Sequence, residues 1–134
     1  MACAIVRRMD RWSPELLALL HDLKEVDIET AADDGRTTHR AIIWVVVDEG
    51  EVFIRSWKGE RGRWYREIRA RPEAVLHAGG QSVSVHAEPA IDAESVRRVS
   101  DALRAKYGRG SPESTAGMLL PATLPTTLRV LPAG

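Results

Sequence analysis

A turn rich in basic and hydroxyl side chains precedes the most apolar stretch of the sequence. Arg36, His39 and Arg40 lie within residues 35–40, and the run 41–47 that follows has only apolar side chains. Guanidinium forks and backbone N–H groups at the mouth of a strand can hold a phosphate. The same pattern also fits an ordinary charged turn, so a phosphate site needs support from a neighbouring strand.

A second polar group closes the next predicted strand, residues 52–56. Ser56, Trp57 and Lys58 bring a hydroxyl, an indole and an ammonium group to its end. If the two strands pair, Arg40 and Lys58 approach the same end of a barrel and can share one phosphate. Together, the two segments predict a binding site for a phosphorylated ligand.

Basic residues are also concentrated between residues 55 and 71. They are Arg55, Lys58, Arg61, Arg63, Arg66, Arg69 and Arg71, opposed only by Glu60 and Glu67. The simplest interpretation is a solvated helix face with a charged loop. A weaker alternative is a barrel that binds single-stranded nucleic acid through this patch and Trp57, Trp64 and Tyr65. The zero net charge of the chain argues against that alternative.

Several other kinds of site are missing from the sequence. It has no Gly-x-Ser-x-Gly elbow, no P-loop and no dinucleotide-binding glycine fingerprint. Its one cysteine, Cys3, excludes an internal disulfide framework and fits a reducing compartment. His77 and His86 flank the Gly79-Gly80 pair and could meet across a hairpin, although such histidines are more typical of an exposed sheet face than of a metal site.

The elements that must position these residues begin with a helix. Ser13 can cap it, Pro14 suits its first turn, and leucines at helical spacing follow within residues 16–23. Residues 26–30 alternate as a strand does. Residues 38–47 then predict one long central strand rich in β-branched side chains.

The second half of the chain continues with short helices and hairpins. A short helix ends before Pro72, and strands 74–78 and 81–87 flank the two glycines, which favour a tight turn. An amphipathic helix, a last short helix opened by Ser111 and a closing strand 126–131 follow. About six strands joined by sequential hairpins, with three or four short helices, predict one domain built on an antiparallel barrel.

The apolar runs and the first ten residues indicate where in the cell the protein is expected. No apolar run is long enough to cross a bilayer, and residues 1–10 lack the apolar core of a signal peptide. We therefore expect a cytoplasmic protein without a membrane partner, whose first ten residues are loosely ordered.

The order of these motifs resembles that of the flavin-binding split-barrel superfamily, over about residues 26–131. Residues 40–44, followed one hairpin later by residues 56–58, resemble the flavin-mononucleotide site of pyridoxamine-phosphate-oxidase-like proteins. Residues 64–72 and the two strands after them resemble a stretch of the deazaflavin-dependent reductases of the same superfamily. The chain departs from those reductases at Arg71, where they have asparagine, and in a shorter phosphate-binding turn.

The resemblance implies a fold, a cofactor and a site. The expected fold is mostly β (α+β), a six-stranded antiparallel split β-barrel with three or four short flanking helices over residues 1–134. The cofactor would be flavin mononucleotide (FMN), or alternatively a deazaflavin coenzyme, at the interface of a homodimer. Arg40 and Lys58 would hold its phosphate, with Arg36 and His39 as second-rank candidates. The walls around its ring would be Ala41, Ile42, Ile43, Trp44, Ile54, Arg55, Ser56 and Trp57.

The leading functional prediction is a flavin- or deazaflavin-binding oxidoreductase of the hydride-transfer type, whose substrate the sequence does not name. The alternative is a non-enzymatic module of the same fold that carries or sequesters a flavin, a haem-like molecule or another anionic ligand. No side chain is assigned as a catalytic acid or base. Turnover with a reductant would separate the enzyme from the carrier.

Overall fold

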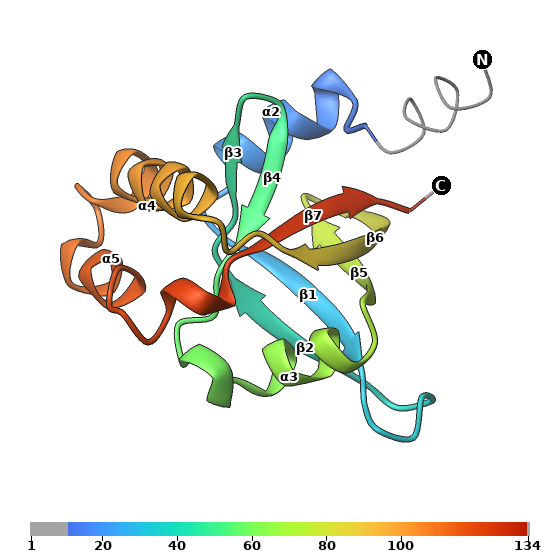
Figure 1. The fold of residues 1–134 in the computed structure, drawn as a ribbon. Helices are drawn as coiled ribbons and strands as arrows, with labels where there is room; N and C mark the ends of the chain where they lie inside the picture. The colour runs from blue at the N-terminus through green and yellow to red at the C-terminus, as the bar shows by residue number, and fades with distance from the viewer. Residues whose placement is uncertain (1–10, 134) are drawn as a thin grey trace, which may run out of the picture.

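The computed structural model describes residues 11–133 of the 134-residue chain (Figure 1). The first half contains helix α2 (Pro14–Asp22), strands β1 (Val26–Ala31), β2 (Thr38–Ile43), β3 (Val46–Asp48) and β4 (Glu51–Ile54), the 3₁₀ turn η1 (Gly59–Arg61) and helix α3 (Arg63–Ala70). The second half contains strands β5 (Glu73–Ala78) and β6 (Gln81–Pro89), helices α4 (Ala93–Tyr107) and α5 (Pro112–Met118), the 3₁₀ turn η2 (Leu124–Thr126) and strand β7 (Leu128–Pro132). The expectations about residues 1–10 and Cys3 lie outside the described residues.

One antiparallel sheet contains all seven described strands, in the order β2-β1-β5-β6-β7-β4-β3. Its two edge strands, β2 and β3, follow each other in the chain, so the sheet curls into a half-barrel (Figure 1). The predicted antiparallel barrel is confirmed in outline. The predicted number of six strands is wrong, because the described sheet has seven.

The additional strand arises from a break in the segment predicted as one strand, residues 38–47. Its first part, β2, pairs with β1, whereas its second part, β3, pairs with β4. Between them, the Val45 carbonyl accepts a hydrogen bond from Lys106 Nζ at 2.8 Å, and the Val45 N–H donates to the Tyr107 hydroxyl at 3.3 Å. Because helix side chains satisfy this backbone, it needs no strand partner, and the chain can pass from one sheet edge to the other.

The inner face of the half-barrel is apolar, and helices α2 and α3 pack against it. Strand β1 alternates as predicted, with Val26, Ile28 and Thr30 buried on this face. Leu20 of α2 and Ile68 of α3 are almost fully buried in the same cluster. Burial of one such apolar side chain contributes about 1.5–3 kcal/mol, so this cluster joins the sheet and both helices into one unit.

A second, smaller core lies between helix α4 and the β3–β4 end of the sheet. Phe53 is fully buried there and packs in one cluster with Val46, Val99 and Tyr107. The helix starts after Asp92, as predicted, and the Asp92 carboxylate accepts a hydrogen bond from the first turn. This core fixes the end of α4 beside the break between β2 and β3.

The hairpin between β5 and β6 forms at the predicted glycine pair. Gly79 and Gly80 have φ values of +55° and +82°, which a residue without a side chain adopts at little cost. The flanking histidines do not meet: His77 Nε2 lies 2.8 Å from Glu29 Oε1, and His86 Nδ1 lies 3.2 Å from a Glu73 carboxylate oxygen. Within residues 11–133, no group of three or more His, Cys, Asp or Glu side chains could hold a metal ion.

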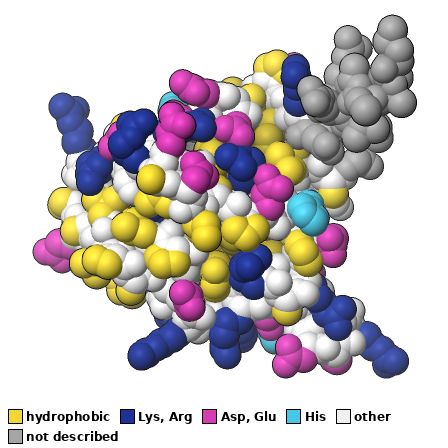
Figure 2. Space-filling view, in the orientation of Figure 1, with side chains coloured by type: hydrophobic (Ala, Val, Ile, Leu, Met, Phe, Trp, Pro, Cys, Tyr) yellow, Lys and Arg dark blue, Asp and Glu magenta, His cyan; other side chains and the backbone are white. Residues whose placement is uncertain are grey.

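The surface divides into charged and apolar regions. Helix α3 exposes Arg63, Arg66 and Arg69 while it buries Ile68, which is the solvated helix face that the simplest interpretation predicted. Figure 2 shows apolar side chains gathered over α5 and mixed charges around them. None of the described helices combines the length and the apolar composition needed to cross a membrane.

Candidate functional site

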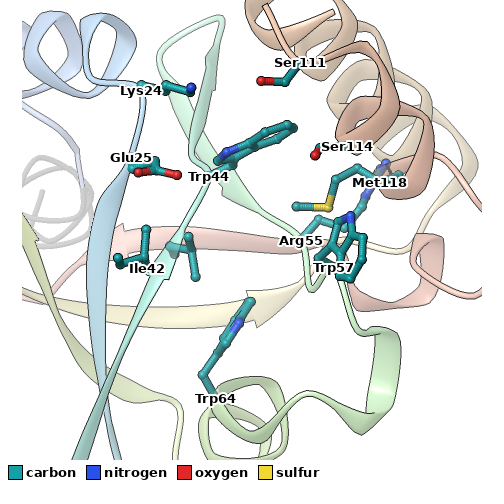
Figure 3. A pocket seen from close by; sticks show the side chains of 11 residues that line it. Lys24, Glu25, Ile42, Trp44, Arg55, Trp57, Trp64, Ser111, Ser114 and Met118 are labelled. Atoms are coloured by element: carbon teal, nitrogen blue, oxygen red, sulfur yellow. Dashed lines mark hydrogen bonds between the residues drawn. The ribbon is translucent and has the colours of Figure 1, made fainter.

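A cavity of about 360 Å³ opens where the half-barrel is split, between the end of β2 and the end of β4 (Figure 3). We call it the tryptophan pocket. The strand ends and helix α3 line it with Ile42, Ile43, Trp44, Arg55, Trp57 and Trp64. Its volume falls within the range of about 300–1,000 Å³ that is typical of small-molecule sites.

Three indole rings from three segments converge on the tryptophan pocket (Figure 3). Trp44 stacks on Tyr107, with ring centroids 3.9 Å apart and planes 4° from parallel. Trp57 is 59% exposed and lies against α5, where a Cβ added at Gly117 would come within 2.7 Å of the indole nitrogen. Trp64 stands on α3 at the opposite side of the cavity. The pocket thus offers aromatic surfaces held by three separate elements.

Arg55 is the buried cation of the site, with a side chain that is 1% exposed. It donates to the hydroxyls of Thr127 and Ser100 at 2.9 and 3.1 Å. It also donates to the carbonyls of Met118 and Val96 at 3.0 and 3.1 Å, and no described carboxylate pairs with it. Burial lowers the pKa of Arg55 to about 10. Arg55 therefore stays protonated at neutral pH and places an uncompensated positive charge beside the pocket.

Half of the ten predicted site residues line the tryptophan pocket: Ile42, Ile43, Trp44, Arg55 and Trp57. Three others support it from within the fold. Ala41 packs against the inner core, and Ile54 belongs to that core. Ser56 is buried, and its hydroxyl donates to the Gly59 carbonyl at 2.7 Å, which shapes the turn after β4.

The two cations predicted for the phosphate lie outside this lining. Arg40 is on the outer face of β2, where its Nη2 donates to Asp27 Oδ2 at 2.9 Å. Lys58 is exposed between β4 and η1. Strands β2 and β4 are not neighbours in the sheet, so strand pairing does not bring Arg40 and Lys58 together. A phosphate shared by the two residues stays a prediction.

The turn before β2 is organised by Asp34. The N–H groups of Arg36 and Thr37 donate to Asp34 Oδ1 at 2.9 and 2.8 Å, and the Thr37 hydroxyl donates to Oδ2 at 2.7 Å. These bonds, with that of the Thr37 hydroxyl foremost, lower the pKa of Asp34 to about 2. His39 points toward α3, where its Nδ1 lies 2.8 Å from Glu67 Oε2. The backbone donors expected for a phosphate are therefore already bonded to a carboxylate.

The part of the lining that comes from other elements was not predicted from the sequence. The missed residues are Lys24, Glu25, Trp64, Ser111, Ser114 and Met118. Of these, only Trp64 was considered from the sequence, in the weaker nucleic-acid alternative and in the stretch 64–72 that resembles the deazaflavin-dependent reductases. The remaining five have no shared spacing, since they lie before β1 and around α5, so no pattern in the sequence could have grouped them.

Lys106 and Tyr107 join the break between β2 and β3 to α2. Lys106 Nζ donates to the carbonyl of Leu20 at 2.8 Å, and the Tyr107 hydroxyl donates to that of Lys24 at 2.6 Å. Burial lowers the pKa of Lys106 to about 8 and raises that of Tyr107 to about 12. These bonds hold the Tyr107 ring in place, and that ring supports Trp44 in the tryptophan pocket.

The arrangement is suited to holding a flat aromatic molecule that carries negative charge. Indole rings favour stacked or edge-to-face contacts with another ring. The uncompensated charge of Arg55 attracts an anionic group in the cavity. Glu25 is the one carboxylate in the described lining, and it stands at the exposed rim.

The comparisons by sequence place the chain among bacterial proteins. The family model described as "Uncharacterized protein conserved in bacteria (DUF2255)" matches residues 16–130. That span contains the whole lining of the tryptophan pocket. No curated protein matches the sequence.

Solved structures share the fold at low sequence identity. HutZ, the haem storage protein from Vibrio cholerae, is 14% identical, with a TM-score of 0.64 over 92% of each chain. A Listeria innocua protein assigned as a pyridoxamine 5′-phosphate oxidase is 13% identical, with a TM-score of 0.59 over 89% of this chain and 90% of that one. An F420-H2-dependent reductase (FDR-A) is 15% identical, with a TM-score of 0.58 over 80% of this chain and 93% of that one. The fold is therefore the split barrel that these proteins share, as the resemblance predicted.

Proposed function

The chain belongs to the bacterial family DUF2255, and we propose that it is a flavin- or deazaflavin-binding protein of the oxidoreductase type. The cofactor ring would lie in the tryptophan pocket. The observation that carries the proposal is the convergence of three indoles and one uncompensated guanidinium on a cavity at the split of the barrel. The cofactor supplies hydride transfer when bound, while the chain binds, orients and shields it.

The lining fits a planar heteroaromatic ring. Trp44 is already oriented by Tyr107, and Ile42 and Ile43 add apolar surface beside it. An aromatic contact contributes about 0.5–1.5 kcal/mol beyond the area it buries. Two or three such contacts, together with the apolar area, are enough for affinity in the micromolar range, about −8 kcal/mol.

Arg55 adds the electrostatic part of the fit. Its charge is held by hydroxyl and carbonyl groups and has no described carboxylate partner. A positive charge beside a flavin-type ring favours the reduced, more negative form of the cofactor. Arg55 would thus tune the cofactor without itself transferring a proton.

The phosphate of the cofactor is proposed to bind at Arg40 and Lys58. Both side chains are exposed, and Lys58 has no hydrogen bond or ion pair to a described residue. Arg40 would exchange its contact with Asp27 for the phosphate, a small loss because exposed ion pairs contribute about 0–1 kcal/mol. Ala41, Ile54 and Ser56 would support the walls from behind.

A homodimer is proposed because the pocket has an apolar, open rim. Ile42 is 67% exposed and Trp57 is 59% exposed at the two strand ends. A second copy that covered this rim would bury both side chains and shield the ring from water, with an interface above about 1,000 Å². Light scattering should give the mass of a dimer, and a monomer at high protein concentration would contradict the proposal.

Carriage of haem is the second candidate function. HutZ, a haem storage protein, shares the fold, and the Met118 thioether lines the tryptophan pocket. A thioether can serve as one axial ligand of haem iron. The described lining offers no histidine, the commonest haem ligand, so the flavin-type proposal ranks first.

Titration of the purified protein with FMN, a deazaflavin and haem tests the proposed function. Binding should quench tryptophan fluorescence, because three indoles line the pocket. FMN or the deazaflavin is expected to saturate at about micromolar concentration or below. Saturation by haem alone would favour the carrier, and no response to any ligand would overturn both candidates. Turnover with a reductant then separates an enzyme from a flavin carrier.

A further inference from the structure

A second cavity, of about 390 Å³, adjoins the tryptophan pocket beside the ends of α2 and α4. We call it the lysine pocket, and its lining is His21, Asp22, Lys24, Lys106, Tyr107, Gly110 and Ser111. The two cavities share Lys24 and Ser111, which lie above Trp44 in Figure 3. Trp44 lines the first cavity and Tyr107 lines the second, so their stacked rings form the boundary between the two.

The two lysines of this cavity have no anionic partner among the described residues. Lys24 makes no side-chain hydrogen bond or ion pair with them. Lys106 donates only to the carbonyls of Leu20 and Val45, both at 2.8 Å, which leaves one of its three N–H groups free. Asp22 is the one carboxylate in the lining. Its charge acts on Lys106 without direct contact and partly offsets the effect of burial on the Lys106 pKa, but it forms no ion pair with either lysine.

Two other partly buried cations of the described surface have carboxylate partners. Arg98 bonds to Asp48 at 2.6 Å and to Glu51 at 3.1 Å, and Arg129 lies 2.7 Å from Glu51 and 3.2 Å from Glu88. Lys106 differs from them because it is half-buried and has only neutral acceptors. A charge taken partly out of water without a counter-charge in direct contact is costly, and a bound anion offsets that cost.

We propose that the lysine pocket binds the anionic group of the substrate, a carboxylate or a phosphate ester, next to the cofactor ring. The substrate would therefore be a small organic anion. Its uncharged part would extend over the shared rim of Lys24 and Ser111 toward the tryptophan pocket. This proposal rests on the proposed function for the ring, but the anion site itself depends only on the lysine pocket.

Inorganic phosphate and acetate are the probes for the test, at constant ionic strength with chloride as the balancing anion. Binding to the cofactor-free protein is followed by tryptophan fluorescence, because Trp44 stands at the boundary of the lysine pocket. We expect saturable binding of at least one probe at about millimolar concentration. The probe that binds more tightly identifies the substrate group as a phosphate ester or a carboxylate.

Lys24→Gln should weaken that binding about tenfold, the loss expected for one charge-assisted hydrogen bond. Arg69→Gln is the control, since Arg69 is also exposed, lines neither cavity and is not among the residues proposed for the cofactor phosphate. Lys106→Gln should weaken binding as well, and a thermal melt checks that it folds. No saturation up to about 100 mM, or equal weakening by Lys24→Gln and Arg69→Gln, overturns the proposal.

Measurements on protein loaded with FMN test whether an anion bound in the lysine pocket lies next to the cofactor ring, as the substrate proposal requires. If the anion binds next to the ring, phosphate or acetate should shift the visible spectrum of the bound flavin with the same midpoint as the fluorescence change. Saturable binding without that shift would leave an anion site but refute its role for the substrate. If no flavin binds, the proposed function fails, and the fluorescence measurement still decides whether the lysine pocket holds an anion.

Discussion

The two segments that the sequence analysis assigned to one site, residues 40–44 and residues 54–58, are built in opposite ways. In the first, strand alternation exposes Arg40 and Ile42 on the open face of an edge strand. In the second, the first three residues are buried and only the last two, Trp57 and Lys58, reach the surface. Both segments end at the tryptophan pocket, but only the first is a free edge of the sheet.

The contrast is clearest between their two arginines. Arg40 has one exposed partner, Asp27, so it can change partners at little cost. Arg55 is buried and donates hydrogen bonds to α4, to the end of α5 and to Thr127, which follows η2. It thereby joins these three segments to the end of β4. An arginine on the edge strand is thus available to bind a ligand, whereas the one after the interior strand holds elements together, and substitutions should separate the two roles.

The largest effect is expected for Arg55→Met. It should lower the free energy of unfolding by about 3 kcal/mol or more, because buried polar groups left without a donor cost about 1–3 kcal/mol each. Urea denaturation measures the loss. Arg63→Met, at an exposed position on α3, is the control and should stay within about 0.5 kcal/mol of wild type. Equal stability of Arg55→Met and wild type would remove the contrast between the two arginines.

The next effect concerns the cofactor phosphate. Arg40→Ala and Lys58→Ala should each weaken FMN binding about tenfold to a hundredfold, the loss of one charge-assisted hydrogen bond. Calorimetric titration measures it, and stability should change by less than about 1 kcal/mol. Arg63→Ala and Arg69→Ala are controls on the solvated face of α3.

The pattern among these four variants decides how the phosphate is held. Weakening by all four to the same extent would indicate a diffuse electrostatic field in place of a discrete site. Unchanged affinity in all four would place the phosphate away from Arg40 and Lys58.

A smaller effect is expected for Trp57→Ala. The indole is mostly exposed, so stability should change by about 0.5 kcal/mol or less. Affinity for the cofactor ring should fall about threefold to tenfold, because one aromatic contact is lost. Fluorescence titration compares it with Ile91→Ala, an equally exposed apolar residue outside the pocket lining. A similar loss in both variants would exclude a specific role for the indole.

The smallest effect is the pH dependence that Lys106 imposes. Its pKa is about 8 in the folded protein against 10.5 for an ordinary lysine, so the unfolded chain binds the proton more tightly between these values. The free energy of unfolding should therefore rise from pH 8 to pH 10, by about 1 kcal/mol or less for a half-exposed group. Above pH 10, the raised pKa of Tyr107 acts in the opposite direction, because the unfolded chain then holds fewer protons than the folded one.

Urea titrations between pH 7 and pH 10 measure this slope, and Lys106→Met should lack it. A slope that persists in Lys106→Met would assign the pH dependence to another group.

Local patterns were sufficient to predict most elements. Ser13 accepts the N–H of Leu16 at 3.1 Å as the predicted helix cap, and the Gly79-Gly80 pair forms the predicted hairpin. Such features depend on residues only a few positions apart, so the sequence displays them directly.

By itself, the sequence determined most of the antiparallel strands, their turns and the helix caps. Only the tertiary structure decided that the strand 38–47 divides at Val45, that Arg55 turns inward, and that Lys24 meets Ser111 between two cavities. The physical reason is the distance along the chain. The bond from Arg55 to Thr127 joins residues 72 positions apart, and the bond from Lys106 to Val45 joins residues 61 apart. Such partners exist only once the sheet has curled and α4 has packed against it, because no local pattern records an acceptor from another element.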